Sequence, residues 1–379
     1  MTALQFLADS SANDAIREKL REFPNRVYFP NFGKGDNIFK EGIDIDRVLF
    51  TVPGTNFKIY WYGFLITIGI LLAMIYGFRR MKTVGIDPDR ATDAVIGGLI
   101  GAIFGARFYY IIFNTEGMKF SEFFDIRDGG LAIYGGLIGA IIVGGIIAKV
   151  RKLKLTALLD VVAPCFLIGQ CIGRWGNFFN QEAFGCNTTL PWGMFSEATE
   201  DYLMGSTVTV PKGVTIDPAM PVHPTFLYES IWCFVGLALL AAYIKKRKFN
   251  GDIALRYLVW YGAGRFWIEA LRTDSLLLVP SLGLRASQLV AAAAVVGGVA
   301  LEIFLTRKYK SRPLMVTLAL TAENRSLLAK VRRAEPEFTV EREELVASSP
   351  RKLFLERTNA YNERVKQLLK EKLAEKKDA

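Results

Sequence analysis

The strongest constraint on this chain is a series of long apolar runs between residues 59 and 306. A helix needs about 20 mostly apolar residues to cross the hydrocarbon core of a membrane. Seven segments meet that requirement: residues 59–78, 91–113, 130–148, 157–179, 226–244, 253–271 and 284–306. The sequence therefore predicts an all-α membrane protein, a polytopic bundle of about seven transmembrane helices.

The charges between these segments alternate in sign along the chain. Basic clusters follow the first, third, fifth and seventh segments, whereas the connections after the second and fourth are mainly acidic. Because basic connections stay in the cytoplasm, we expect the N-terminus outside and the C-terminus in the cytoplasm. Orientation and contact with anionic lipids also account for the net charge of +10, so no nucleic-acid partner is expected.

The polar ends divide the chain into three parts. Residues 1–58 are expected to form an extracytoplasmic extension, residues 59–307 the transmembrane domain, and residues 308–379 a charged cytoplasmic tail. Within the tail, residues 353–376 are expected to form an amphipathic or solvated helix. Four cysteines in 379 residues are too few for a disulfide scaffold, and a single histidine provides no usual zinc site.

Glycines recur every fourth residue inside three of the predicted spans. This spacing lets helix backbones approach closely in lipid, so we interpret it first as helix packing. A second interpretation concerns residues 128–136, where glycine N–H groups at the mouth of the third span are free to bind a lipid phosphate. The recurring glycines are Gly97, Gly101, Gly105, Gly135, Gly139, Gly169 and Gly173.

Ionisable residues within the predicted spans point to a functional site. Charges are costly in a bilayer, so they default to paired or functional roles. Arg265 and Glu269 lie four residues apart, on one helix face, and are able to pair. An excess of arginines over acids favours an anionic ligand, because guanidinium binds phosphate through two parallel donors. The residues of this set are Arg107, Arg174, Glu229, Arg265 and Glu269.

The densest polar run is residues 173–185, with the sequence GRWGNFFNQEAFG. This run resembles the signature of the prolipoprotein diacylglyceryl transferase family, Gly-Arg-x-Gly/Ala-Asn-Phe-x-Asn-x-Glu-x-x-Gly, at every specified position. Three further stretches resemble family motifs, and the resemblance covers roughly residues 59–307. These stretches are YWYG at 60–63, the glycine-rich run 128–139, and HPTFLYE at 223–229; the region from Tyr261 to Arg272 also resembles that of the family's second essential arginine.

The resemblance implies an enzyme of the bacterial cytoplasmic (inner) membrane. Such an enzyme transfers the sn-1,2-diacylglyceryl group of phosphatidylglycerol to the lipobox cysteine of a prolipoprotein signal peptide. A thioether forms and glycerol phosphate leaves, which is the first step of lipoprotein maturation. The partners implied are phosphatidylglycerol, the prolipoprotein and membrane lipids, and neither a cofactor nor a metal is expected.

The resemblance also implies roles for individual residues. Arg174 is assigned to the phosphatidylglycerol head group and Arg265 to the phosphate as the C–O bond breaks. Tyr134 stands where some members carry a histidine proposed as base, and it is a candidate catalytic hydrogen-bond donor. Further substrate-binding candidates are Asn177, Glu182, Gly185, Tyr62, Tyr261 and Gly135. Structural or orienting roles are assigned to His223, Glu229 and Glu269.

Two questions stay open at this stage. The base for the substrate thiol is unidentified: His223, Glu229 and Glu269 are candidates, and nearby arginine charges alone can lower a thiol pKa. The function also has an alternative, a transporter or flippase of anionic lipids, which would share the helices, the polar cavity and the arginines.

Overall fold

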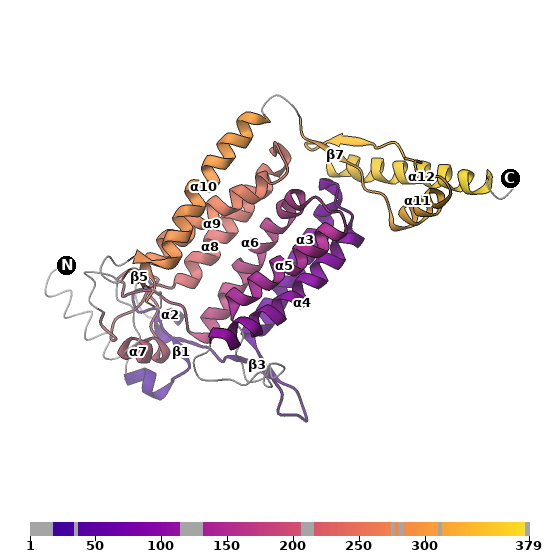
Figure 1. The fold of residues 1–379 in the computed structure, drawn as a ribbon. Coiled ribbons are helices and arrows are strands. Elements are labelled where there is room, and N and C mark those ends of the chain that lie inside the picture. The colour runs from indigo at the N-terminus through magenta and orange to yellow at the C-terminus, as the bar shows by residue number, and fades with distance from the viewer. Residues whose placement is uncertain are drawn as a thin grey trace. The chain divides into compact units, whose positions relative to one another are not determined.

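The computed structural model describes residues 18–33, 37–113, 132–205, 216–273, 277–279, 284–309 and 313–375 (Figure 1). Its helices are α2 (Ile38–Glu41), α3 (Trp61–Met81), α4 (Pro88–Phe113), α5 (Ile133–Val150), α6 (Leu155–Asn180), α7 (Glu197–Met204), α8 (Thr225–Tyr243), α9 (Asp252–Leu271), α10 (Ala286–Lys308), α11 (Ala322–Ala334) and α12 (Arg351–Glu375). Its strands are β1 (Arg26–Val27), β2 (Ile43–Asp44), β3 (Val48–Thr51), β4 (Lys58–Tyr60), β5 (Leu277–Val279), β6 (Leu284–Arg285), β7 (Met315–Thr317) and β8 (Glu344–Val346).

Each predicted span coincides with a helix, namely α3, α4, α5, α6, α8, α9 and α10. Five of these are long and apolar enough to cross a membrane: α3, α4, α6, α8 and α10. The apolar part of α5 is shorter, at Tyr134–Val150, and α9 carries Arg256, Arg265 and Glu269 within its 20 residues. The start of the segment predicted at 130–148 lies outside the described residues.

Short strands, which the sequence did not predict, occur in the segments outside the long helices. Four two-stranded antiparallel sheets occur in the described residues, pairing β1 with β2, β3 with β4, β5 with β6 and β7 with β8. These short ladders satisfy backbone N–H and C=O groups that a folded connection would otherwise leave unpaired. The protein is therefore mostly helical, and β4 leads directly into α3.

The chain divides into two compact units, and the first comprises residues 1–75, 163–242 and 255–307. Its N-terminal segment packs onto the segment that follows α6. Val27 and Ile45 share a buried cluster with Met194 and Val222, and the backbones of Tyr28 and Phe195 exchange two hydrogen bonds of 2.8 Å. Part of the expected N-terminal extension is thus built into a common core.

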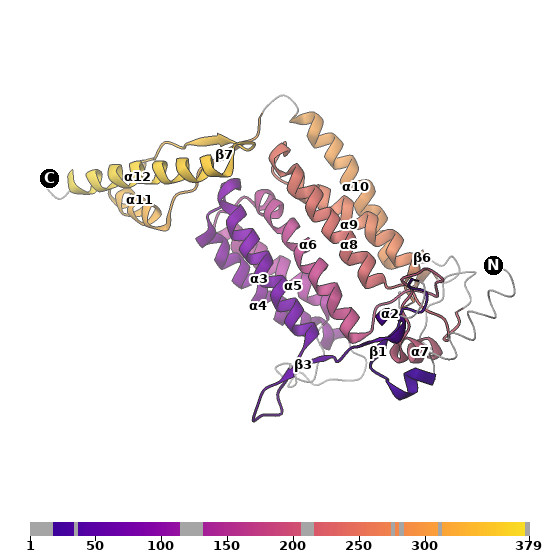
Figure 2. The same ribbon diagram turned by 180° about the vertical axis from the view of Figure 1, so that it is seen from behind.

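Two tryptophans join α8 to α9 in the first unit, where α8, α9 and α10 lie side by side (Figures 1 and 2). The rings of Trp232 and Trp260 stack with centroids 4.4 Å apart. Each indole N–H donates to the backbone carbonyl of the other residue at 2.9 Å. Gly264 lies against the Trp232 indole and Gly236 against that of Trp260, where a Cβ atom would clash. This reciprocal contact fixes the two helices that carry most of the candidate acids and arginines.

The second unit comprises residues 76–162, 243–254 and 308–379. Within it, α4 and α5 pack through the glycines predicted for close helix approach. A Cβ atom added to Gly101 or Gly105 would lie 2.5 or 2.4 Å from the backbone oxygen of Gly139 or Gly135, respectively. The helix-packing interpretation is confirmed for this pair of helices, whereas a Cβ on Gly173 of α6 would meet nothing within 4 Å among the described residues.

One charge that interrupts a predicted span has a structural role. Asp160 of α6 is 1% exposed and accepts hydrogen bonds from the backbone N–H groups of Gly251, Ile253 and Ala254 at 2.9–3.1 Å. It also pairs with Arg247 at 3.4 Å. The first N–H groups of a helix lack partners within it and favour negative charge, so Asp160 anchors the N-terminus of α9.

The C-terminal segment is folded around its own core, which agrees with an amphipathic helix rather than with a solvated one. A helix does form there, as predicted, at Arg351–Glu375. Its apolar face is buried against β7 and α11, because the 308–379 segment contains enough apolar residues to close a small core. The buried residues of this core include Val316, Leu318, Val331, Phe354, Tyr361, Val365 and Leu369.

Candidate functional site

Glu229 of α8 connects two arginines from neighbouring helices. Its Oε1 atom lies 2.5 Å from Nη2 of Arg174 on α6, and its Oε2 atom lies 3.4 Å from Nη1 of Arg265 on α9. Arg265 also pairs with Glu269, 2.6 Å away and four residues along the same helix, as predicted. Arg174 and Arg265, which are 55 and 36 positions from Glu229 in the sequence, thus meet at one carboxylate.

The charges of the four residues joined here balance, with two arginines against two glutamates. Glu229 and Glu269 are each 3% exposed, and a buried carboxylate without a cationic partner is strongly destabilising. The two arginines neutralise them. Each guanidinium has five N–H donors, more than these contacts use, and this leaves donors that can reach an anionic ligand.

A line of polar contacts leads from the arginines to the end of α6. Arg174 donates to Oδ1 of Asn177 at 3.3 Å, and Nδ2 of Asn177 donates to Glu182 at 2.9 Å. The Asn180 amide donates to the same carboxylate oxygen at 3.2 Å. Tyr261 of α9 joins from the other side, because its hydroxyl donates to Glu229 at 3.4 Å. Five residues proposed from the sequence therefore belong to one network: Arg174, Asn177, Glu182, Glu229 and Tyr261.

Glu182 faces a cavity of about 1040 Å³ beside the start of α3. Tyr62 lines the same cavity, and its ring lies so close to Gly176 that a Cβ atom there would be 2.6 Å from it. The backbone that forms this wall is unusual, since Gln181 and Ala183 have φ values of +54° and +58°. Non-glycine residues seldom adopt this left-handed conformation, which is found at sites held in place by their surroundings.

Sequence reasoning missed two cations of this cavity. Arg47 and Lys58 both line it, although they precede the first span and were not considered site residues. A signal that could have found Lys58 is its position, because it lies two residues before Tyr60, the first of the aromatic residues that open the span. Asn180, the second asparagine of the 173–185 signature, was likewise not predicted to be a site residue, although its amide contacts Glu182.

Gly185 has a structural reason for being glycine. Its N–H donates to the carbonyl of His223 at 2.9 Å, and an added Cβ atom would lie 2.9 Å from the Leu271 carbonyl oxygen. The next residue, Cys186, donates its N–H to that same carbonyl at 2.7 Å. Burial raises the pKa of the Cys186 thiol, which opposes a role for it as a thiolate nucleophile.

His223 lies in a different set of contacts from the arginines. Its Nδ1 atom is 3.0 Å from the hydroxyl of Tyr228, and that hydroxyl accepts a 2.7 Å hydrogen bond from the indole of Trp192. Burial lowers the pKa of His223, so the ring is neutral at pH 7. A neutral ring held between these partners fits an orienting residue.

Tyr134 and Gly135 stand at the start of α5 in the second unit. The Tyr134 side chain is 70% exposed. Gly135 packs against α4, where an added Cβ atom would lie 2.3 Å from both the Gly105 carbonyl oxygen and Cβ of Tyr109. Helix packing explains this glycine, and the rest of the glycine motif, residues 128–131, lies outside the described residues.

Comparison with known proteins agrees with the signature at residues 173–185. The family model described as prolipoprotein diacylglyceryl transferase matches residues 47–304. The chain belongs to this family. With five helices able to span a membrane, this family member is a multi-pass protein of the bacterial cytoplasmic membrane.

Three relatives of the family illustrate the likeness, and each is described as a phosphatidylglycerol–prolipoprotein diacylglyceryl transferase. The protein from Finegoldia magna is 42% identical over 271 residues, which cover 71% of this chain and 97% of the relative. The one from Clostridium novyi is 44% identical over 269 residues, with 70% and 98% covered. The one from a Bacillus cereus strain is 43% identical over 257 residues, with 66% and 89% covered. The diacylglyceryl transferase match ends at residue 304 and therefore excludes α11 and α12.

Proposed function

We propose that this protein transfers the sn-1,2-diacylglyceryl group of phosphatidylglycerol to the lipobox cysteine thiol of a prolipoprotein. The observation that carries the proposal is the pair of arginines joined by Glu229, within the segment that matches the transferase family. The substrates named for the relatives are an anionic lipid and a protein, which suits a membrane site with arginine donors.

The reaction exchanges one bond to carbon for another. The thiolate sulfur attacks the glyceryl carbon, the C–O bond to phosphate breaks, and its electron pair stays on the departing glycerol phosphate. The thiol proton passes to water or to the phosphate. Because a phosphate monoester is stable as an anion, the main requirement is to hold its growing negative charge. Fixed donors aimed at such a charge can each contribute about 2.7–4 kcal/mol.

In this proposal Arg174 binds the head group and Arg265 stabilises the phosphate as the C–O bond breaks. Glu229 and Glu269 position the guanidinium groups, and Tyr261 and Asn177 fix their orientation through the contacts above. Tyr62 and Glu182 line the adjacent cavity and orient the glycerol head group. Tyr134 stays a proposed hydrogen-bond donor on the strength of the family resemblance alone, and His223 stays an orienting residue.

We also infer that seven helices span the membrane, with the N-terminus outside and the C-terminus in the cytoplasm. Arg174 lies near the end of α6, Glu229 near the start of α8, and Arg265 near the end of α9. Their mutual contacts require that these three helix ends lie together. The charges of the connections assign that side to the exterior. Residues 1–58 are then extracytoplasmic, residues 59–307 catalytic, and residues 308–379 cytoplasmic.

A direct assay separates this proposal from lipid transport. Purified protein is incubated with phosphatidylglycerol and a peptide that carries a lipobox cysteine, and the peptide mass is measured. The transferase adds the mass of one diacylglyceryl group at the cysteine. An unchanged peptide in several detergents, together with movement of labelled phosphatidylglycerol between vesicle leaflets, would favour the alternative, a flippase of anionic lipids.

A further inference from the structure

A second cavity, of about 590 Å³, lies in the second unit. Its walls come from the connection between α3 and α4, the connection between α5 and α6, and the C-terminal segment from β7 to α11. The residues from β7 to α11 follow residue 304, where the family match ends. This cavity is therefore built partly from a portion of the chain outside the matched transferase segment.

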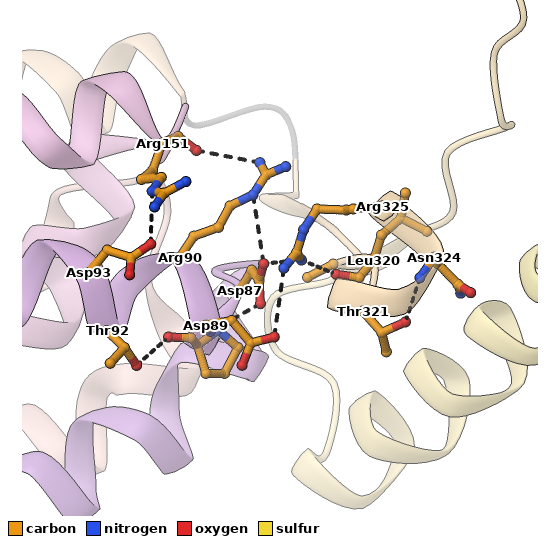
Figure 3. A network of polar contacts seen from close by, with 12 residues as sticks. Asp87, Asp89, Arg90, Thr92, Asp93, Arg151, Leu320, Thr321, Asn324 and Arg325 are labelled. Carbon is orange, nitrogen blue, oxygen red and sulfur yellow. Dashed lines mark hydrogen bonds and ion pairs between the residues drawn. The ribbon is translucent and has the colours of Figure 1, made fainter. Parts of the chain in front are cut away.

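Ion pairs hold the C-terminal wall against the connection between α3 and α4 (Figure 3). Arg325 of α11 pairs with Asp87, and it lies 3.6 Å from Asp89. Arg90 approaches the same Asp87 carboxylate at 3.7 Å and the Arg151 carbonyl at 3.4 Å. Burial raises the pKa of Asp87 and the Arg325 charge lowers it, so the arginine offsets the cost of keeping this carboxylate charged.

The lining carries far more positive than negative charge. Asp87 is its sole acidic side chain among the described residues, against six cations: Arg90, Lys152, Lys154, Arg325, Arg332 and Arg333. Arg90 and Arg325 are engaged with Asp87, and Arg332 donates to the Phe338 carbonyl at 2.9 Å. Lys152, Lys154 and Arg333 have no ion pair or side-chain hydrogen bond within the described part of the chain. These three cations are available to an anion.

The backbone at Lys152 supports a role for that side chain. Lys152 follows α5 with φ of +56°, a left-handed conformation in which helices usually place glycine or asparagine. Lysine at this position is conformationally unfavourable relative to glycine. Its presence is explained if the ammonium group itself is needed in the cavity.

Apolar side chains form the remainder of the wall, among them Ile86, Leu153, Val316 and Leu328. A lining that is part cationic and part apolar suits a molecule with a charged phosphate and an apolar portion. The cavity also lies where α3 and α5 end and α4 and α6 begin, which is the level of the lipid head groups in the proposed topology. Clusters of lysine and arginine at this level attract anionic lipids.

We propose that this cavity binds a phosphate ester, by means of Lys152, Lys154 and Arg333. The shared chemistry is a phosphate ester anion, either the head group of an anionic phospholipid or a water-soluble phosphate ester. This site is separate in residues from the proposed transfer site, and it gives residues 308–379 a role in recognising such an anion.

The test measures binding to the full-length protein in detergent by calorimetry. Both variants carry Arg174→Gln, which weakens lipid binding at the proposed transfer site. The cavity variant adds Lys152→Gly, Lys154→Gln and Arg333→Gln. The matched control adds Lys352→Gln, Lys370→Gln and Lys372→Gln, which remove the same three charges from α12, outside the cavity lining. The titrants are dihexanoyl-phosphatidylglycerol, dihexanoyl-phosphatidylcholine and glycerol 3-phosphate.

We expect the cavity variant to bind dihexanoyl-phosphatidylglycerol at least about tenfold more weakly than the control, since each basic side chain contributes to attraction of the anion. Weaker binding of the lipid alone identifies a lipid head group, and an equal loss for glycerol 3-phosphate identifies a soluble phosphate ester. Equal affinities of the two variants, or phosphatidylcholine bound as tightly as phosphatidylglycerol by the control, would overturn the proposal. Thermal unfolding verifies that both variants are folded, and no turnover is needed, so the result does not depend on the transferase activity.

Discussion

Neutralising Glu229 is the most informative change at the arginine cluster. In Glu229→Gln the shape is kept, but the carboxylate that pairs with Arg174 at 2.5 Å and with Arg265 at 3.4 Å loses its charge. Hydrogen bonds to charged groups each contribute about 1.5–3 kcal/mol. Removing one partner of a buried ion pair typically costs about 3–5 kcal/mol, and Glu229 is 3% exposed. We therefore expect a stability loss of about 3–5 kcal/mol and two arginines that lose the carboxylate they share, while Arg265 keeps Glu269 and Arg174 keeps Asn177.

Catalysis should suffer more than stability in this variant. A displacement of about 1 Å can lower a rate by roughly 100-fold, so we expect diacylglyceryl transfer to a lipobox peptide to fall at least about 100-fold. The assay measures the peptide mass over time, with thermal unfolding in detergent alongside it.

The matched control is Glu302→Gln. Glu302 pairs with Arg256 at 2.5 Å, so this variant also removes the charge of a glutamate that contacts an arginine in the first unit. Those side chains are 22% and 28% exposed, so a loss of about 1 kcal/mol or less is expected with unchanged transfer. Equal transfer rates for Glu229→Gln and Glu302→Gln would refute the reasoning. Recovery of Glu229→Gln above pH 8.5, where a free thiol ionises unaided, would identify Glu229 as a base rather than a positioning residue.

Three further predictions follow from single contacts. Burial lowers the pKa of His223 below its usual value of about 6.5. The unfolded state therefore binds more protons as pH falls through about 6.5, and thermal unfolding should show a stability loss from pH 7 to pH 5 that is smaller in His223→Gln. This variant should keep most of its transfer activity at pH 7. Gly185→Ala places a Cβ 2.9 Å from the Leu271 carbonyl oxygen and should lower the unfolding temperature, whereas Gly173→Ala, with no described atom within 4 Å, should not. Gly139→Ala, which would meet the Gly101 carbonyl oxygen at 2.0 Å, should likewise destabilise the protein relative to Gly145→Ala on the same helix, which has open space. A lower unfolding temperature for Gly173→Ala than for Gly185→Ala, or for Gly145→Ala than for Gly139→Ala, would contradict the close contact described for that glycine. The same loss of stability from pH 7 to pH 5 in His223→Gln as in the native protein would contradict the burial of His223.

Local sequence patterns predicted the helices well, because a long apolar run has few alternatives in a membrane. The pairing of Arg265 with Glu269 followed from their spacing on one helix. The contacts of Glu229 did not, since they join three helices that only tertiary packing brings together. The signature identified Asn177 and Glu182 as polar residues, but the chain of contacts from Arg174 through Asn177 to Glu182 required coordinates.

Two features of the chain became visible only in the structure, for one physical reason. Gly185 stays a predicted substrate-binding residue, and its lack of a side chain is also required by Cβ of His223 and the carbonyl oxygen of Leu271. The sequence left open whether the helix near the C-terminus is amphipathic or solvated, and the burial of Phe354, Tyr361 and Leu369 shows that one face of it is covered. In both cases the deciding partner is distant in sequence. Composition and local spacing contain no information about such partners.

The mass of a lipobox peptide after incubation with phosphatidylglycerol and Arg174→Ala tests the central claim most directly. Arg174 is placed by Glu229 and Asn177, and in our account its guanidinium binds the head group whose phosphate must leave. The native protein should add one diacylglyceryl group to the cysteine, while folded Arg174→Ala should leave the peptide mass unchanged. Transfer by Arg174→Ala at the native rate would contradict the account.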